Sequence, residues 1–242
     1  MHRLLVDPSL LAQDTVLLPK DAARHLKVLR PRPGEEIELF DGAGKTRVYH
    51  WQAGAQLDAP GAPTVHPRTA LPLTLFACVT KGSRWDWTIE KAVELGVSRI
   101  VPVISERCIV RLAAHEREAK AARWRRVAED AARQSDAVWL PEIVAPVDFA
   151  ASLDLVRTCG TVFAGALTTP PPKPLLAAVA EAKRKTQTAA NGLGLYVGPE
   201  GDFTPTELQA LLEIAVPTSF GPTILRAETA AVFGLSVLAA SL

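Results

Sequence analysis

The chain has 242 residues, of which 48% are hydrophobic and 22% are charged, and its formal net charge at pH 7 is +1. This composition is typical of a packed globular protein and excludes a wholly disordered chain. At roughly 100–200 residues per domain, the length fits one large domain or two small ones. Because the charge is near neutral, any binding of nucleic acid must depend on local basic patches.

Neither the N-terminus nor the cysteines point to secretion, a membrane or a metal. No apolar run reaches the roughly 18 residues of a membrane span, and Asp7 and Pro8 interrupt the N-terminus before a signal-peptide core. Cys78, Cys108 and Cys159 form no Cys-X-X-Cys pair, which favours reduced thiols over disulfides or a zinc site. We therefore expect a cytoplasmic protein without a metal.

The first 70 residues predict a small β-barrel or sandwich. A short helix is expected over residues 20–30, and the polar–apolar alternation of residues 36–39 predicts a half-buried strand. The glycines within residues 41–44 predict a hairpin turn, with a return strand over residues 47–51. The proline-rich stretch at residues 58–67 is typical of a linker or an irregular crossing.

After residue 71 the pattern changes to strands that alternate with helices. Strands are expected at 73–79, 97–104, 161–167, 193–197 and 218–220, and helices at 83–95, 115–137, 174–185, from Thr204 and from about Ala227. This order predicts an α/β fold with a parallel sheet covered on both faces. Ligands of such sheets bind beyond the carboxyl ends of the strands. The candidate loops are 80–84, 105–110, 165–172, 198–203 and 221–226.

The first candidate motif is the Gly-Pro-Glu-Gly-Asp-Phe segment at residues 198–203, between a buried strand and a capped helix. Its glycines allow the backbone to approach a ligand closely, and the helix start beyond it favours polar or anionic groups. A tight strand-to-helix turn also needs glycine, so a purely structural role stays open.

The second candidate is the segment that leads to Arg226, which is the only basic residue after Lys185. A lone cation at the start of an apolar helix needs a partner or a charged ligand. Either Arg226 acts on a substrate, or it forms a structural ion pair with Glu200 or Glu228.

Three groups of basic residues are candidates for contact with RNA or its phosphates. One lies on and just after the first predicted helix, one follows the first buried strand of the α/β region, and one lies on the long predicted helix. They are His25, Lys27, Arg30 and Arg32; Lys81 and Arg84; and Arg123, Arg125, Arg126 and Arg133. An ordinary solvated surface is the alternative for all three groups.

Signatures of several other enzyme classes are missing. There is no GxxxxGK[ST], HExxH or GxSxG motif, and Gly192, Gly194 and Gly198 are too widely spaced for GxGxxG.

Five segments together resemble a known family, the RsmE family of bacterial 16S rRNA (uracil-N3)-methyltransferases in the SPOUT superfamily. They are His25-Leu-Lys-Val-Leu-Arg30, Lys81-Gly82 with Glu90–Val97, Gln134-Ser135 with Pro141-Glu142, Gly198-Pro-Glu-Gly201, and Ile224-Leu-Arg-Ala-Glu-Thr-Ala230. They follow the family's order over nearly the whole chain, and the last two at this spacing are highly specific.

The resemblance implies a PUA-like β-barrel for RNA contact over residues 1–70 and a trefoil-knotted SPOUT methyltransferase domain over 71–242. It also implies a homodimer that modifies a uridine near the 3′ end of 16S rRNA in the small ribosomal subunit, with S-adenosylmethionine as methyl donor and S-adenosylhomocysteine as product. The implied cofactor-binding residues are Gly165, Ala166, Leu167, Gly198, Pro199, Glu200, Gly201, Phe220, Gly221, Ile224, Leu225, Arg226 and Thr229.

In catalysis, we expect Arg226 to stabilise the uracil anion that forms when the N3 proton leaves. Glu200 or Glu228 is then expected to orient Arg226 or to accept that proton. The implied RNA contacts are His25, Lys27, Arg30, Lys81 and Arg84.

Two positions depart from the family pattern. Asp136-Ala137 stands where Gly-Arg usually follows the Gln-Ser pair, which removes or moves a basic RNA contact. Asp202 stands where a third glycine is common, a milder change because aspartate tolerates turn conformations.

Two alternatives to a methyltransferase stay open. A non-catalytic RNA-binding factor of ribosome assembly would bind RNA and no cofactor, and a nucleotide-dependent α/β enzyme would prefer NAD or ATP.

Overall fold

The computed structural model describes residues 1–68, 71–185 and 191–242, and the chain divides into two compact units. The first unit is Met1–Thr69 together with Glu129–Leu140, and the second is Ala70–Ala128 together with Pro141–Leu242. The predicted boundary at residue 70 lies outside the described residues, and that prediction assigned 129–140 to the C-terminal domain.

A six-stranded mixed sheet forms the first unit. Its elements are β1 (His2–Leu5), a 3₁₀ helix (Pro8–Ala12), β2 (Thr15–Leu17), α1 (Lys20–Leu29), β3 (Glu36–Phe40), β4 (Lys45–Ala53), β5 (Gln56–Asp58) and β6 (Thr64–Val65). The strand order is β1-β3-β4-β5-β2, with β6 paired to β4. Within the described residues of this unit, the β1–β3 pair is parallel and the other strand pairs are antiparallel. In the predicted linker, therefore, Thr64 and Val65 form a short strand.

Two buried arginines tie the loops of the first unit to its sheet. Arg47 donates hydrogen bonds to the carbonyl oxygens of Leu11 and Gln13 and pairs with Asp14 at 2.6 Å. Arg3 pairs with Glu38 and donates to the carbonyl oxygens of residues 132 and 137. Since a buried cation needs such partners, each arginine fixes the segments that supply them.

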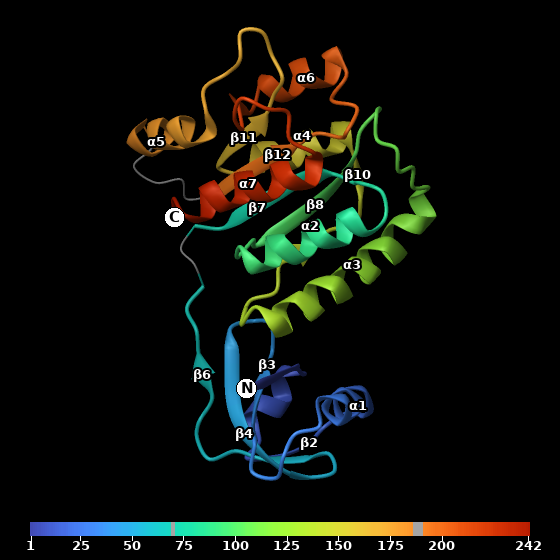
Figure 1. The fold of residues 1–242 in the computed structure, drawn as a ribbon, viewed down its shortest axis with the longest axis vertical. Helices are drawn as coiled ribbons and strands as arrows, with labels where there is room; N and C mark the ends of the chain where they lie inside the picture. Colours follow the sequence, from blue (N-terminus) through green and yellow to red (C-terminus); the bar gives the residue numbers. More distant parts are fainter. Residues whose placement is uncertain (69–70, 186–190) are drawn as a thin grey trace. The chain divides into compact units, whose positions relative to one another are not determined.

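A seven-stranded parallel sheet forms the centre of the second unit (Figure 1). Its strands are β7 (Leu73–Cys78), β8 (Arg99–Ile104), β9 (Glu142–Ile143), β10 (Val147–Asp148), β11 (Thr161–Gly165), β12 (Leu193–Val197) and β13 (Val216–Thr218). Its helices are α2 (Ser83–Glu94), α3 (Ala114–Gln134), α4 (Phe149–Thr158), α5 (Leu175–Lys185), α6 (Pro205–Leu212) and α7 (Ala227–Ala239), and the last residues of α3 belong to the first unit. The strand order is β10-β8-β7-β12-β11-β13, with β9 paired to β8, which confirms the predicted parallel α/β sheet.

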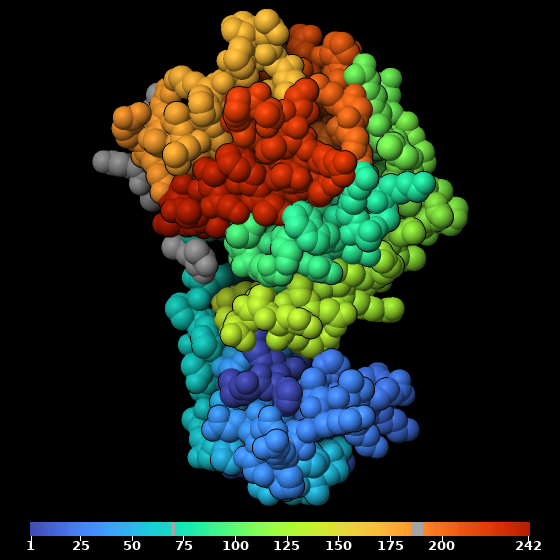
Figure 2. Space-filling model, viewed as in Figure 1, coloured from blue at the N-terminus to red at the C-terminus, as the bar shows by residue number. Residues whose placement is uncertain are grey.

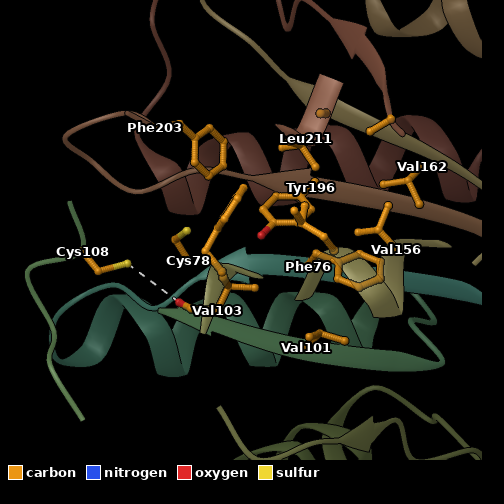
Figure 3. Close-up of a cluster of buried hydrophobic side chains, with 14 residues drawn as sticks. Phe76, Cys78, Val101, Val103, Cys108, Val156, Val162, Tyr196, Phe203 and Leu211 are labelled. Carbon is orange, nitrogen blue, oxygen red and sulfur yellow. Dashed lines mark hydrogen bonds between the residues drawn. The ribbon is translucent and has the colours of Figure 1, made fainter. Parts of the chain in front are cut away.

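Helices cover both faces of this sheet, as the alternation of strands and helices in the sequence predicted, and every residue of β7 and β12 is buried. On one face α2 and α7 lie side by side, and Figure 2 shows both helices at the surface, in teal to green and in red. On the other face, side chains from α4 and α6 pack around Tyr196 and Phe76, whose rings stack with their centroids 5.6 Å apart (Figure 3). The Tyr196 hydroxyl lies 2.6 Å from Ser152 Oγ, so this buried polar group is satisfied.

Local signals set several helix ends where the sequence predicted them. Thr204 and Glu207 form the expected capping box at the start of α6. The helix predicted over 115–137 ends earlier, at Gln134, because Asp136 takes a left-handed conformation with φ of 56°.

Other differences come from pairing between strands. The strand predicted at 218–220 is β13 at 216–218, because Gly165 is paired with Thr218 while Ser219 donates its backbone N–H to Lys173. The strands β9 and β10 have two residues each, too short to produce a periodic pattern.

The turns that precede β11 and β12 touch at Gly160, where an added Cβ would lie 2.1 Å from the carbonyl oxygen of Gly192. Backbone must move to relieve such a clash, so we expect Gly160→Ala to lower the free energy of unfolding by about 2 kcal/mol. Gly61→Ala is the matched control, because a Cβ there meets nothing within 4 Å. Equal urea midpoints for the two variants would contradict the prediction.

Candidate active site

Three loops meet at the carboxyl ends of the neighbouring strands β12, β11 and β13. They enclose a cavity of about 280 Å³. Its lining comprises Gly165, Ala166, Leu167, Val197, Gly198, Pro199, Glu200, Asp202, Thr218, Ser219, Phe220, Gly221, Thr223, Ile224, Leu225, Arg226, Ala227 and Ala230. Two motifs singled out in the sequence, residues 198–203 and 220–230, are thus brought together although residues 204–219 lie between them.

Eleven of the thirteen predicted cofactor-binding residues line this cavity; the other two, Gly201 and Thr229, do not. Sequence reasoning did not assign to the site several residues that also line it, among them Thr218 and Ser219. Thr218 and Ser219 could have been found from their position at the end of β13, next to β11, but this position is known only once the pairing of the two strands is known.

Gly165 holds an aromatic ring against the base of the cavity. A Cβ on this residue would lie 2.6 Å from Phe220 Cε2, so the ring packs directly on the backbone. Phe220 in turn packs on Phe233 of α7, with ring centroids 5.9 Å apart. Glycine is therefore required here for close approach, and the loop after β13 is anchored to both β11 and α7.

The loop at residues 198–203 is held from a neighbouring loop by Arg107, which sequence reasoning did not single out. Its Nη1 donates to the carbonyl oxygens of Gly201 and Phe203, at 3.2 and 3.3 Å. Asp202 has φ of 59°, and its Oδ1 accepts a hydrogen bond from the Phe203 N–H. The family's glycine at this position is thus replaced by a residue that also tolerates the left-handed conformation.

Asp136, the other departure from the family pattern, lies in the first unit and also has a positive φ. Its Oδ1 lies 3.7 Å from Nε of the buried Arg3. The cation next to Asp136 is therefore the buried Arg3, whose hydrogen bonds are made within the first unit, and not an exposed arginine that would be available to RNA.

Arg226 lines the cavity and is exposed. Across the described ranges it forms no ion pair, so the structural pairing with Glu200 or Glu228 that the sequence left open is absent. Both carboxylates instead approach Arg84, each at 3.8 Å. Arg226 thus faces the cavity with its charge uncompensated by a carboxylate.

The predicted RNA contacts lie in both units and are exposed. His25 and Lys27 lie on α1, and Arg30 follows it with φ of 51° beside a second cavity of about 600 Å³. In the second unit, Lys81 is exposed before α2, whereas Arg84 is engaged with the two glutamates. Their role in binding RNA stays a prediction.

Cys78 and Cys108 lie buried at the ends of β7 and β8 (Figure 3), and the buried hydroxyl of Ser105 lies between the two thiols. Ser105 Oγ lies 3.5 Å from Cys78 Sγ and 3.3 Å from Cys108 Sγ, and the Ser105 N–H also donates to Cys108. Hydrogen bonds from Cys78 and Ser105 lower the pKa of the Cys108 thiol to about 6, while burial raises the pKa of Cys78. No sequence pattern pointed to this pair.

Within residues 1–68, 71–185 and 191–242, no three His, Cys, Asp or Glu side chains are grouped so that they would hold a metal ion. Of the helices in the same ranges, none has both the length and the apolar character needed to cross a membrane.

The fold is a parallel α/β sheet with a cavity built by loops at the carboxyl ends of its strands. Comparison of the sequence with known protein families identifies the class of protein that has this fold. A family model described as RNA methyltransferase domain matches residues 67–239, and one described as RNA methyltransferase PUA domain matches residues 18–50. The protein is an RNA methyltransferase by family.

Relatives that match over most of this chain narrow the class. The chain is 31% identical over 249 residues to ribosomal RNA small subunit methyltransferase E of Synechocystis, covering 100% of this chain and 78% of the relative. It is 33% identical over 225 residues to the protein of that name from Mycobacterium tuberculosis, covering 87% and 80%. The chain belongs to the ribosomal RNA small subunit methyltransferase E family.

Solved structures agree with this assignment. The crystal structure of ribosomal RNA small subunit methyltransferase E from Neisseria gonorrhoeae, bound to S-adenosyl methionine, matches with a TM-score of 0.79 and 30% identity, covering 98% of this chain and 95% of the other. A putative methyltransferase of Legionella pneumophila, also in complex with S-adenosylmethionine, matches with a TM-score of 0.76 and 26% identity, covering 99% and 96%.

The thiol cluster predicts how stability depends on pH. The pKa of Cys108 is about 6 in the folded chain, below the ordinary value of 9, so between these values the unfolded chain binds more protons. Cys108 therefore stabilises the fold fully above pH 9, and this contribution is lost as the pH falls through 6. Its slope reaches at most about 1.4 kcal/mol per pH unit.

We expect Cys108→Ala to remove this slope from the free energy of unfolding, measured by urea denaturation between pH 6 and 9. Cys159→Ala is the control, because burial raises the pKa of that thiol and its loss leaves the slope below pH 9 unchanged. A slope that persists in Cys108→Ala would show that the thiolate is not held in the folded state.

Proposed function

We propose that this protein transfers a methyl group from S-adenosylmethionine to N3 of a uridine near the 3′ end of 16S rRNA in the small ribosomal subunit. The observation that carries the proposal is the cavity built by the loops after β11, β12 and β13 in a chain of this family. Family membership also favours an enzyme over a non-catalytic assembly factor or a nucleotide-dependent enzyme.

The residues around the cavity suit the proposed donor. Apolar side chains, among them Leu225 and Ile224, would pack against adenine, and backbone groups of the three loops would bind its polar edge. The carboxylates of Glu200 and Asp202 suit a ligand with positive charge on sulfur and on its amino group. When bound, the donor supplies a methyl group activated by the sulfonium.

Arg226 would act on the acceptor base. Uracil N3 carries a proton at neutral pH, so negative charge develops on the ring as that proton leaves. This charge is lost again when N3 bonds to the methyl group and the methyl–sulfur bond of the donor breaks. An arginine that lines the cavity without a carboxylate partner is suited to stabilise this charge. The charge of its guanidinium persists at any pH at which the enzyme works.

Glu200 is the better placed of the two glutamates to accept the N3 proton. It lines the cavity beside Arg226, whereas Glu228 lies outside the lining. The side chain of Glu200 is 23% exposed, so a proton taken up there has a route to solvent.

The acceptor base must be unpaired, because N3 lies on the Watson–Crick edge and is engaged in a duplex. The basic side chains of α1 and Lys81 are exposed and would bind the phosphates that flank the target. As finer features of the same proposal, the first unit is a PUA-like barrel, the second is a SPOUT domain with a trefoil knot, and the protein is a homodimer that works in the cytoplasm.

The decisive experiment adds the protein and methyl-labelled S-adenosylmethionine to small ribosomal subunits from a strain that lacks this gene. We expect label on one uridine of 16S rRNA, and mass spectrometry of the isolated nucleoside to identify 3-methyluridine. Label on another RNA or at another ring atom would overturn the substrate assignment. A thermal shift with S-adenosylmethionine, and none with NAD or ATP, would test the donor separately.

Arg226→Ala should lower kcat by at least about 100-fold, because it removes the charge that stabilises the uracil anion. The affinity for S-adenosylhomocysteine, measured by calorimetry, should stay within a few-fold of wild type. Turnover at the wild-type rate would refute the role of Arg226, and loss of product binding would show that it serves the donor instead.

A further inference from the structure

Two arginines and two glutamates lie around the mouth of the cavity, and their pairing is uneven. Arg84 takes both carboxylates: its Nη1 lies 3.8 Å from Glu200 Oε1, and its Nε lies 3.8 Å from Glu228 Oε1. Arg226 has no such partner among the described residues, although it lines the cavity together with Glu200 and precedes Glu228 by only two residues. Glu228 is thus paired with Arg84, which is distant in the sequence, and not with Arg226, which is close in the sequence.

Glu228 depends on this arrangement. Its side chain is 12% exposed, and in the described structure its Oε2 is buried without a hydrogen-bond partner. A buried carboxylate of this kind needs a cation nearby, because its own solvation has been lost. If Arg84 were absent, the cation nearest along the chain would be Arg226.

The fold holds Arg84 at the right place. Gly82, with φ of 67°, turns the chain after β7 into α2, so Arg84 lies in the first turn of that helix. The helices α2 and α7 pack side by side, with the first turn of α2 next to the first turn of α7 (Figures 1 and 2). Arg84 therefore approaches Glu228 from a different helix than the one that carries Arg226.

We propose that Arg84 is a positioning residue that pairs with Glu200 and Glu228 and so keeps Arg226 unpaired and available to the acceptor base. This inference rests on the proposed function, since it assigns Arg226 to the uracil. It replaces the expectation that Arg84 binds RNA phosphates: a guanidinium already engaged with two carboxylates brings no net positive charge to the RNA.

The two roles of Arg84 have different kinetic consequences. If Arg84 positions Arg226, its loss lets Glu228 capture Arg226, which lowers kcat while the KM for RNA and the affinity for S-adenosylhomocysteine change little. If Arg84 binds a phosphate, its loss raises the KM for RNA and reduces the salt dependence of RNA binding by about one phosphate contact.

The test compares Arg84→Gln, Arg84→Lys and the double variant Arg84→Gln/Glu228→Gln with wild type. Arg157→Gln serves as the control for loss of a surface charge, because Arg157 pairs only with Asp154 of its own helix in the described structure. For each protein we would measure kcat, the KM for small subunits, and the Kd for S-adenosylhomocysteine by calorimetry. A crystal structure of Arg84→Gln would locate Arg226 directly.

We expect Arg84→Gln to lower kcat about tenfold with Kd and KM within threefold of wild type, and Arg157→Gln to match wild type. Arg84→Lys, which keeps the charge, should retain most of kcat. The double variant should recover at least about threefold of the lost rate, because one competing carboxylate is gone. In the crystal, Arg226 should lie within 4 Å of a carboxylate oxygen of Glu228 or Glu200.

Other outcomes would overturn the inference. An unchanged kcat with a raised KM for RNA would return Arg84 to RNA binding. A loss of kcat that the second substitution fails to relieve, or an Arg226 that stays unpaired in the variant crystal, would exclude the capture of Arg226. If wild type neither binds S-adenosylhomocysteine nor methylates small subunits, the proposed function itself fails, whatever Arg84 does.

Discussion

The parallel hydrogen bonding of β7, β12, β11 and β13 is the constraint on which the site depends. Because all four strands run in one direction, their following loops are delivered to the same edge of the sheet. This shared direction brings the loops around 165–167, 198–202 and 218–227 together at the cavity. Further contacts hold these loops in place: the Phe220 ring packs on the backbone of Gly165, and Arg107 donates a hydrogen bond to the Gly201 carbonyl oxygen in the neighbouring loop.

Charge at this edge is arranged between helices rather than within them. The first turn of α7 carries Glu228, yet the cation that compensates it comes from α2. A guanidinium is suited to this because it presents several donors in a fixed plane and stays charged. In the first unit, too, an arginine joins separate segments: Arg3 of β1 donates to one carbonyl oxygen in the last turns of α3 and to another just after that helix, those of Ala132 and Ala137.

Local patterns predicted most of what local forces decide. The buried strands β7 and β12, the capped start of α6 at Thr204 and the two loop motifs all lie where the sequence indicated. Contacts between segments distant in the sequence were not predicted, since no periodicity encodes them. Examples are the contacts that group residues 129–140 with the first unit, the Cys78–Cys108 cluster, and the ion pairs of Arg84. Gly201 and Thr229 show the limit of a motif, which marks a segment but not which of its residues face the cavity.

The walls of the cavity differ in how much change they tolerate. At Gly165 a single added carbon meets an aromatic ring at 2.6 Å, so that side is rigid and shares its atoms with the packing of the fold. Ile224, by contrast, is 79% exposed, and Leu167 is 58% exposed, so their side chains are held by few neighbours. Engineering for bulkier sulfonium analogues should therefore begin at these two mouth residues, where a larger ligand gains room without a cost in foldability.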